Sequence, residues 1–255
     1  MSTLFSLAKR TIIITGGGRG VGLTLAHAIT EFGGRAACLD IHPMATGDLP
    51  ANATYSVCDV TNEESVKARF AEIRAESERC GSRVEGVVAC AGIQQVTEAL
   101  EYGVRDWRRM MEVNVLGAFL TAKHGAKILI DGETPGSVVL VASMSGRIAN
   151  RGLNCSAYNT SKAAVLQMGR SLAQEWGKYG IRVNTLSPGY IRTNMTDTVL
   201  YENPDYYKTW MAGAMLGRLG VVDDFKGPAV YLLSDASRWM TGADLLVDGG
   251  HVASA

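Results

Sequence analysis

Short apolar segments alternate with longer segments of helical periodicity along almost the whole chain, and this alternation limits the possible folds more than any other feature. The apolar segments are rich in Val, Ile and Ala, which is typical of strands buried on both faces. The sequence predicts seven strands, at 11–15, 35–39, 54–57, 84–89, 138–142, 183–186 and 245–247. Helices are predicted between most of them, at 23–32, 63–80, 105–130, 157–179 and 223–234.

Continuous apolar strands that alternate with helices imply a parallel sheet, because each parallel connection has to cross over the sheet. We therefore predict an α/β fold, a single doubly wound domain over residues 1–255 with a seven-stranded parallel sheet and helices on both faces. Residues 41–53 are the exception among the crossovers, because Pro43 and Pro50 argue against a full helix there.

Composition excludes several classes of partner. The 25 Lys and Arg residues balance the 25 Asp and Glu residues, so no net field attracts nucleic acid or an anionic membrane. We find no signal sequence or membrane span and expect a cytoplasmic protein that acts on a small molecule. The five cysteines form no CxxC pair and the four histidines have no ligand spacing, so we predict no disulfide framework and no metal site.

A cluster of glycines follows the first predicted strand, in Thr-Gly-Gly-Gly-Arg-Gly-Val-Gly from Thr15 to Gly22. Glycine permits positive φ angles and lets a diphosphate approach the N–H groups at the start of a helix. Asp40 ends the next strand about 20 residues later, where a carboxylate can accept hydrogen bonds from both hydroxyls of an adenosine ribose. That charge would repel the 2′-phosphate of NADP, so we predict NAD as the cofactor and NADP as less favoured, although Arg19 could face a phosphate.

Tyr158 and Lys162 lie four residues apart on a predicted helix, so both side chains rise from one face. Ser143 ends the strand before that helix, at the carboxyl edge of the sheet where ligands bind in such folds. A lysine ammonium favours a neighbouring phenolate, so we expect Lys162 to lower the pKa of Tyr158 from about 10 towards neutrality. These residues therefore predict an acid–base pair at the ligand-binding edge of the sheet.

In this order, the motifs resemble those of the short-chain dehydrogenase/reductase family over nearly the whole chain. The matching residues are Thr15, Gly16, Gly20 and Gly22 of the glycine turn, Asp59-Val60, Asn114, Ser143, Tyr158 and Lys162, Pro188-Gly189, Thr193, Thr241-Gly242 and Val247-Asp248-Gly249-Gly250. The resemblance implies a Rossmann-type fold and an NAD(P)-dependent alcohol dehydrogenase or ketoreductase.

The resemblance also implies a role for each site residue. Tyr158 would be the general acid or base, Lys162 would hold the nicotinamide ribose, Ser143 would orient the substrate oxygen, and Asn114 would keep a water in the proton path. The cofactor would be bound by Gly16, Gly18, Arg19, Gly20, Val21, Gly22, Asp40, Ile41, Asp59, Val60, Ala91, Gly92, Tyr158, Lys162, Pro188, Gly189, Ile191 and Thr193.

Two positions depart from the family pattern. Ala89 and Cys90 stand where the family has two asparagines, so the side-chain amide that normally steadies the central strand is missing. Ser143 lies 15 residues before Tyr158, whereas Ser145 has the commoner family spacing of 13. We choose Ser143 because an apolar strand runs directly into it.

The loop between Ser143 and Tyr158 resembles the fungal branch of sorbose reductases and polyol dehydrogenases, which implies a polyol or sugar substrate. Residues 190–220 carry several Tyr, Trp and Met side chains and predict a substrate lid that suits a cyclic secondary-metabolite alcohol better. The same segment could instead simply pack against the sheet or a neighbouring subunit.

Other functions fit the predicted fold and its site residues less well. A catalytically silent nucleotide-binding sensor would have no reason to keep the whole catalytic set, and a lyase or isomerase remains a further alternative. The predicted helices at 105–130 and 157–179 are apolar on more than one side, which predicts a homotetramer or a homodimer.

Overall fold

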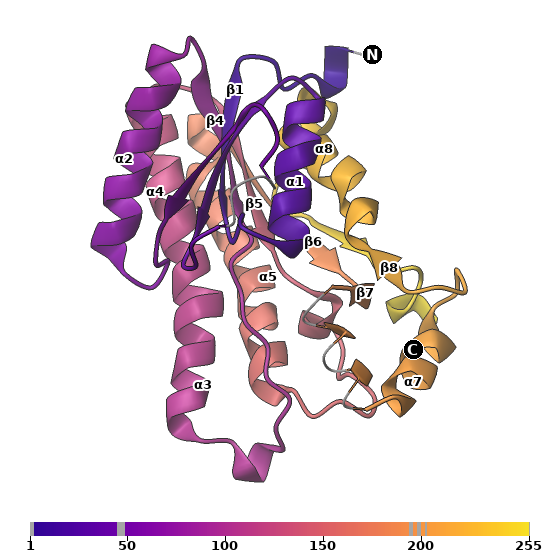
Figure 1. Ribbon diagram of the computed structural model, residues 1–255. Helices are drawn as coiled ribbons and strands as arrows, with labels where there is room; N and C mark the ends of the chain where they lie inside the picture. The colour runs from indigo at the N-terminus through magenta and orange to yellow at the C-terminus, as the bar shows by residue number, and fades with distance from the viewer. Residues whose placement is uncertain (1–2, 45–48, 194–195, 198–199, 202, 255) are drawn as a thin grey trace.

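Seven parallel strands form the central sheet of the computed structural model, which describes residues 3–44, 49–193, 196–197, 200–201 and 203–254 (Figure 1). The strand order is β3-β2-β1-β4-β5-β6-β9, and every neighbouring pair is parallel. The strands are β1 (Arg10–Thr15), β2 (Arg35–Asp40), β3 (Ala53–Val57), β4 (Arg83–Ala89), β5 (Gly136–Val141), β6 (Ile181–Pro188) and β9 (Asp244–Val247). The predicted doubly wound fold and its seven strands are confirmed.

Helices cover both faces of this sheet, as Figure 1 shows. The α-helices of the described residues are α1 (Gly20–Glu31), α2 (Glu63–Arg79), α3 (Val104–Met111), α4 (Gly117–Asp131), α5 (Ser156–Trp176), α7 (Asp205–Gly213) and α8 (Lys226–Leu233). Helices α1 and α8 pack on one face, and α2, α4 and α5 pack on the other. In the described part of the β2–β3 crossover there is no helix, as predicted, while residues 45–48 lie outside the described residues.

The side chains of the central strands alternate between two hydrophobic layers. Ile12 and Ile14 of β1 and Val88 of β4 belong to the layer beneath α1 and α8, whereas Ile13 and Val87 belong to the opposite layer. All five are fully buried. A strand with side chains pointing alternately to two covered faces must be apolar at every position, which explains the continuous apolar runs in the sequence.

The structure departs from the sequence prediction in two places. The helix predicted at 105–130 is interrupted by a π-helical turn at Glu112–Leu116, between α3 and α4. A second, two-stranded sheet joins β7 (Ile191–Arg192) to β8 (Gly220–Val221) across the ends of the predicted lid. Each of these strands has two residues, which is too short to leave a periodic pattern in the sequence.

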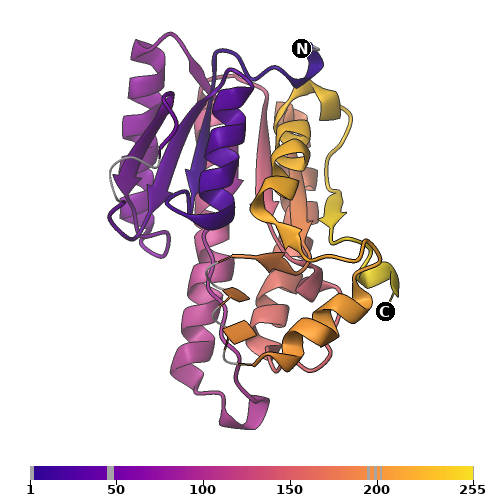
Figure 2. The ribbon, with the colours of Figure 1, turned by 45° about the vertical axis from the view of Figure 1, so that its right-hand side comes forward.

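The site region lies at the carboxyl edge of the sheet. Helix α3, the first turns of α5, and α7 extend beyond this edge on the same side of the molecule (Figures 1 and 2). Of the predicted lid at 190–220, residues 194–195, 198–199 and 202 lie outside the described residues. Over the described residues, no helix is long and apolar enough to cross a membrane.

Candidate active site

The glycine turn between β1 and α1 is shaped by close backbone packing. Gly16 and Gly20 have φ angles of +70° and +54°, a region that favours glycine. A Cβ at Gly16 would lie 2.7 Å from the Cα of Ala91, and a Cβ at Gly22 would lie 2.1 Å from the carbonyl oxygen of Gly16. The N-cap residue, Arg19, supplies no side-chain hydrogen bond to α1. The first N–H groups of this helix are therefore available to an anionic ligand.

Asp40, at the end of β2, faces the same turn. Its Oδ2 accepts a hydrogen bond of 3.1 Å from the N–H of Gly18, and a Cβ at Gly18 would lie 3.1 Å from this oxygen. The neighbouring side chains of Arg19 and Ile41 are exposed, and Val21 is half-buried. The predicted cofactor residues of the first two strands thus meet at one edge of the sheet.

Asp59 and Val60 lie just after β3, at the same edge of the sheet as the glycine turn and Asp40. The Oδ1 of Asp59 accepts hydrogen bonds from the N–H and the hydroxyl of Thr61, at 2.9 and 2.7 Å. Val60 is buried against α4, where a Cβ at Gly117 would lie 2.7 Å from its Cγ2. The Asp59 carboxylate therefore fixes its own turn and holds Val60 in place beside α4.

Ser143, Tyr158 and Lys162 converge beyond the end of β5. Ser143 is buried, and its side chain hydrogen-bonds with that of Tyr158 and accepts the N–H of Ser145 at 3.1 Å. The Lys162 ammonium lies 5.7 Å from the centre of the Tyr158 ring and donates to the carbonyl oxygen of Val141 at 2.8 Å. Of the two candidate serines, Ser143 is the one that contacts Tyr158.

Burial dominates the acid–base properties of this group. It raises the pKa of Tyr158 to about 12, and the hydrogen bond with Ser143 opposes the shift. It lowers the pKa of Lys162 to about 8, against the effect of a negative charge on Cys90. The expected lowering of the pKa of Tyr158 is therefore wrong for this structure, because loss of water disfavours the charged form of both groups.

Asn114 lies in the π-helical turn and is almost fully buried. Its Oδ1 accepts from the N–H of Ile93 at 2.8 Å, and its Nδ2 donates to the carbonyl oxygen of Ile93 and to the Ser161 hydroxyl, both at 3.0 Å. A Cβ at Gly92 would lie 3.4 Å from Oδ1 of Asn114 and 3.6 Å from Nζ of Lys162. The Asn114 amide thus fixes the loop that follows β4, and Gly92 leaves room between this amide and Lys162.

Cys90 stands at a position where the family pattern has an asparagine. Its backbone N–H donates to the carbonyl oxygen of Thr15 at 3.1 Å, so the main chain joins the ends of β4 and β1. Burial raises the pKa of the Cys90 thiol to about 11, which keeps it protonated at neutral pH. All five cysteines of the chain are free.

Residues 188–193 carry the chain from β6 through β7. Pro188 is buried, and Gly189 approaches the backbone so closely that a Cβ would lie 2.6 Å from the Cα of Asp248. Ile191 is buried in β7, and the N–H of Thr193 donates to the Thr196 hydroxyl at 2.8 Å. This segment leaves the sheet beside the C-terminal end of the chain.

An aromatic cluster that the sequence did not reveal packs against Tyr158. Tyr190 stacks on Trp210 of α7, with ring centres 4.2 Å apart and planes at 5°, and meets His251 edge-on at 4.9 Å. The Tyr190 hydroxyl accepts a hydrogen bond of 2.9 Å from Nδ2 of Asn150. Trp210, together with Leu153, Cys155 and Leu219, forms the buried centre of this cluster, against which Tyr158 and Tyr190 pack. Its members are too far apart in the sequence for any local pattern to connect them.

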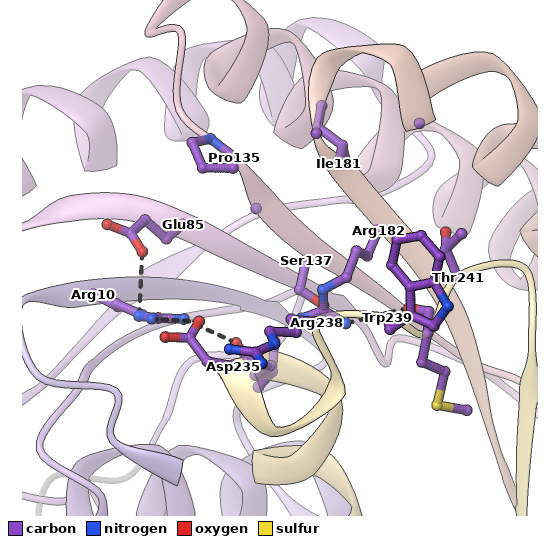
Figure 3. A pocket seen from close by; sticks show the side chains of 15 residues that line it. Arg10, Glu85, Pro135, Ser137, Ile181, Arg182, Asp235, Arg238, Trp239 and Thr241 are labelled. Carbon is purple, nitrogen blue, oxygen red and sulfur yellow. Dashed lines mark hydrogen bonds and ion pairs between the residues drawn. The ribbon is translucent and has the colours of Figure 1, made fainter. Parts of the chain in front are cut away.

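A cavity of about 530 Å³ lies at the opposite, amino edge of the sheet (Figure 3). There Arg10 pairs with Glu85 at 3.2 Å and with Asp235 at 2.9 Å. Arg182 donates to the carbonyl oxygens of residues 232 and 234 and to the Ser237 hydroxyl. Since these charged groups already bind one another or the main chain, the cavity is a structural junction remote from Tyr158.

Comparison with known proteins places the chain in one family. The family model described as enoyl-(acyl carrier protein) reductase matches residues 16–252. A short-chain dehydrogenase/reductase, notP', of Aspergillus versicolor is 44% identical over 98% of this chain and 90% of its own length. Galactitol 2-dehydrogenase (L-tagatose-forming) of Cereibacter sphaeroides is 37% identical over 98% of this chain and 97% of its own.

The fold agrees with these sequence matches. The crystal structure of a gluconate 5-dehydrogenase from Burkholderia cenocepacia, in complex with NADP and tartrate, superimposes with a TM-score of 0.90 at 28% identity and covers 99% of both chains. The chain is an enzyme that uses a nicotinamide dinucleotide on a small molecule, and it belongs to the short-chain dehydrogenase/reductase family of oxidoreductases.

Proposed function

We propose that this enzyme interconverts a secondary alcohol and a ketone with NAD(H), using Tyr158 as the general acid and base. The observation that carries the proposal is the convergence of Ser143, Tyr158 and Lys162 beyond β5, with the glycine turn at the same edge of the sheet. No other group of described residues combines a nucleotide-binding turn with an acid–base pair.

In ketone reduction, the carbonyl carbon receives a hydride and its oxygen receives the proton of the Tyr158 hydroxyl. A bound nicotinamide supplies that hydride, and accepts it in the reverse reaction. Ser143, which hydrogen-bonds with Tyr158, orients the substrate oxygen. Lys162 uses one N–H on Val141 and has two left for the nicotinamide ribose and for proton transfer. Because the Asn114 amide is engaged by the protein, a water in the proton path would bind to the main chain of the π-helical turn.

The residues around the glycine turn fit a dinucleotide, and they favour NAD over NADP. The open N-terminus of α1 suits a diphosphate, and Gly16, Gly18 and Gly22 leave no side chain in its way. The Asp40 carboxylate, fixed by the N–H of Gly18, is placed to accept the ribose hydroxyls and to repel a 2′-phosphate. The NADP complex of the Burkholderia relative makes this choice worth testing directly.

The substrate is a polyol or sugar, or a cyclic secondary-metabolite alcohol, and residues 190–220 form the lid over it. The galactitol 2-dehydrogenase relative supports the first class. The aromatic cluster around Trp210, which packs against Tyr158, supports the second.

We further propose that the protein works in the cytoplasm as a homotetramer or homodimer. The absence of a membrane-spanning helix among the described residues is consistent with the first part. Leu116 and Phe119 support the homo-oligomer, because these apolar side chains are exposed one turn apart, at the end of the π-helical turn and in the first turn of α4.

The experiment follows NADH and NADPH absorbance with a panel of polyols, keto sugars and cyclic ketones. Tyr158→Phe should lower turnover roughly a hundredfold to ten-thousandfold, while Tyr179→Phe, a matched change at an exposed position, should not. Ser143→Ala should impair turnover far more than Ser145→Ala. Turnover that survives Tyr158→Phe would contradict the mechanism. Cofactor binding without any turnover would indicate a sensor, and a chemical change without net NADH consumption would indicate a lyase or isomerase.

A further inference from the structure

Residues 143–147, which we call the serine turn, form a compact unit after the end of β5. The Ser143 hydroxyl accepts the N–H of Ser145 at 3.1 Å, and the Ser143 carbonyl oxygen accepts the N–H of Gly146 at 3.0 Å. The carbonyl oxygen of Met144 accepts the N–H of Arg147 at 2.8 Å. Because these hydrogen bonds overlap, a contact that fixes Arg147 also restrains Ser143.

The serine turn also lies against α5. A Cβ at Gly146 would lie 2.7 Å from the main-chain carbonyl carbon of Lys162, so glycine lets the two backbones touch. Just beyond the turn, Nδ2 of Asn159 donates to the carbonyl oxygen of Ile148 at 3.3 Å. Residues 148–155, which the structure describes throughout, form neither helix nor strand. Such a loop has many conformations to lose, so the chain direction alone restrains the turn little.

An ion pair ties the serine turn to β9, the edge strand of the sheet. Nε of Arg147 donates to Oδ2 of Asp244 at 2.7 Å, and Nη2 lies at the same distance from this oxygen. The Asp244 side chain is 5% exposed. Its Oδ1 accepts the buried hydroxyls of Thr185 and Ser187 on β6, both at 2.6 Å. Two strands therefore hold the carboxylate that Arg147 binds.

The burial of Asp244 separates this ion pair from ordinary surface pairs. Ion pairs between two exposed side chains contribute little, because water competes for both charges. A buried carboxylate has lost that water, and Arg147 is the cation that compensates its charge. Two donors from one planar guanidinium fix its orientation as well as its distance. The pair is thus a directional anchor for the serine turn.

We propose that Arg147 is a positioning residue, whose ion pair with Asp244 holds the serine turn so that Ser143 meets both Tyr158 and the substrate oxygen. Arg147 itself transfers neither proton nor hydride and acts through Ser143. This inference rests on the proposed function, but the restraint on the serine turn can be measured without turnover.

The first test is the rate of ketone reduction by Arg147→Met, which removes both contacts with Asp244. A reacting group misplaced by about 1 Å can lose about a hundredfold in rate, so kcat should fall between about tenfold and a hundredfold. KM for NADH should stay the same, because the cofactor residues lie elsewhere. Arg147→Lys, which keeps the charge without the planar fork, should have an intermediate kcat.

Arg35→Met is the matched control for this variant. It removes a half-buried arginine from its ion pair with Glu76, at 3.1 Å, where β2 begins at the amino edge of the sheet. It should leave kcat unchanged. A wild-type kcat in Arg147→Met, or an equal loss in Arg35→Met, would overturn the inference.

A double-mutant cycle distinguishes positioning from a general loss of structure. If Arg147 acts through Ser143, Arg147→Met should lower kcat by less than about twofold in a Ser143→Ala background. Equal fold losses in both backgrounds would overturn the inference. Arg147→Met combined with Asp244→Asn avoids leaving a buried charge unpaired, and the amide oxygen can still accept both hydroxyls. This folded double variant should keep the low kcat of Arg147→Met, and a wild-type kcat would count against the anchor.

Hydrogen exchange separates the anchor from the proposed reaction. The N–H groups of Ser145 and Gly146 are bonded within the serine turn. Mass spectrometry of the peptides that cover the turn should show exchange at least about tenfold faster in Arg147→Met than in the wild type, and no change in Arg35→Met. Unchanged exchange in Arg147→Met would overturn the inference even if kcat fell. Faster exchange in a protein that reduces no ketone would keep the anchor and refute the proposed reaction.

Discussion

Replacing Lys162 with methionine should remove activity and yet make the folded protein more stable at neutral pH. Lys162 is 5% exposed, and burial lowers its pKa from an ordinary value of 10.5 to about 8. A tenfold change in proton affinity equals about 1.4 kcal/mol, so keeping the buried ammonium charged costs the fold about 3 kcal/mol. Methionine has a similar volume and no charge. It loses the hydrogen bond to Val141, worth about 1 kcal/mol, which leaves a net gain of about 2 kcal/mol.

The stability gained by Lys162→Met should depend on pH, and the pKa of Lys162 determines in which direction. Below pH 8 the folded and unfolded states both bind the Lys162 proton, so the cost of burying the charge is fully present. Between about 8 and 10.5 the folded state releases the proton while the unfolded state keeps it, and the stability of the wild type rises with pH. The advantage of Lys162→Met should therefore be largest at neutral pH and disappear towards pH 10.5.

Urea unfolding of the ligand-free protein at neutral pH and near pH 10 measures both effects. Lys67→Met on α2, where the lysine is exposed, is the matched control and should change stability by less than about 0.5 kcal/mol. Turnover of Lys162→Met should fall at least about a hundredfold. A variant that is less stable than the wild type at neutral pH, or a stability difference that does not change with pH, would refute the reasoning.

Three further predictions concern the cofactor site and the assembly. Asp40→Asn should lower the ratio of kcat/KM for NADH over NADPH at least about tenfold, because it removes the charge that repels the 2′-phosphate; an unchanged ratio would assign the preference elsewhere. Gly22→Ala should cost about 1 to 3 kcal/mol in thermal unfolding, since its Cβ would lie 2.1 Å from the carbonyl oxygen of Gly16. Gly227→Ala in α8, where a Cβ meets nothing within 4 Å, should be neutral or stabilising. Phe119→Asp should lower the mass measured by light scattering, and a monomeric wild type would refute the proposed assembly.

The fold could be predicted from the sequence because its central strands are buried on both faces. Ile12, Ile13 and Ile14 face alternate layers, yet each contacts a hydrophobic layer, so the local sequence alone identifies the strand. The π-helical turn around Asn114 could not be predicted, because the segment 105–130 is apolar on more than one side and so hides the shift of phase that one extra residue causes.

The sequence predicted which residues of the candidate site lie together, but it did not predict their pKa values. The four-residue spacing of Tyr158 and Lys162 indicates that their side chains are neighbours. It does not indicate how much water remains around them, and burial determines both pKa shifts here. The contact of Trp210 with Tyr190 was equally hidden, because only the folded chain brings these two rings together.

The two pKa shifts give the proposed proton relay a direction. With a pKa of about 12, Tyr158 is protonated at neutral pH and ready to give its proton to a carbonyl oxygen. Lys162, with a pKa of about 8, is the stronger acid of the pair, so it can restore the proton that Tyr158 has lost. We therefore expect kcat/KM for ketone reduction to fall as the pH rises through about 8, where Lys162 loses its proton, and kcat/KM for alcohol oxidation to keep rising as Tyr158 becomes easier to ionise. Rates measured in both directions from neutral to alkaline pH would test this, and a reduction rate that stays constant well above pH 8 would show that Lys162 is not the source of the proton.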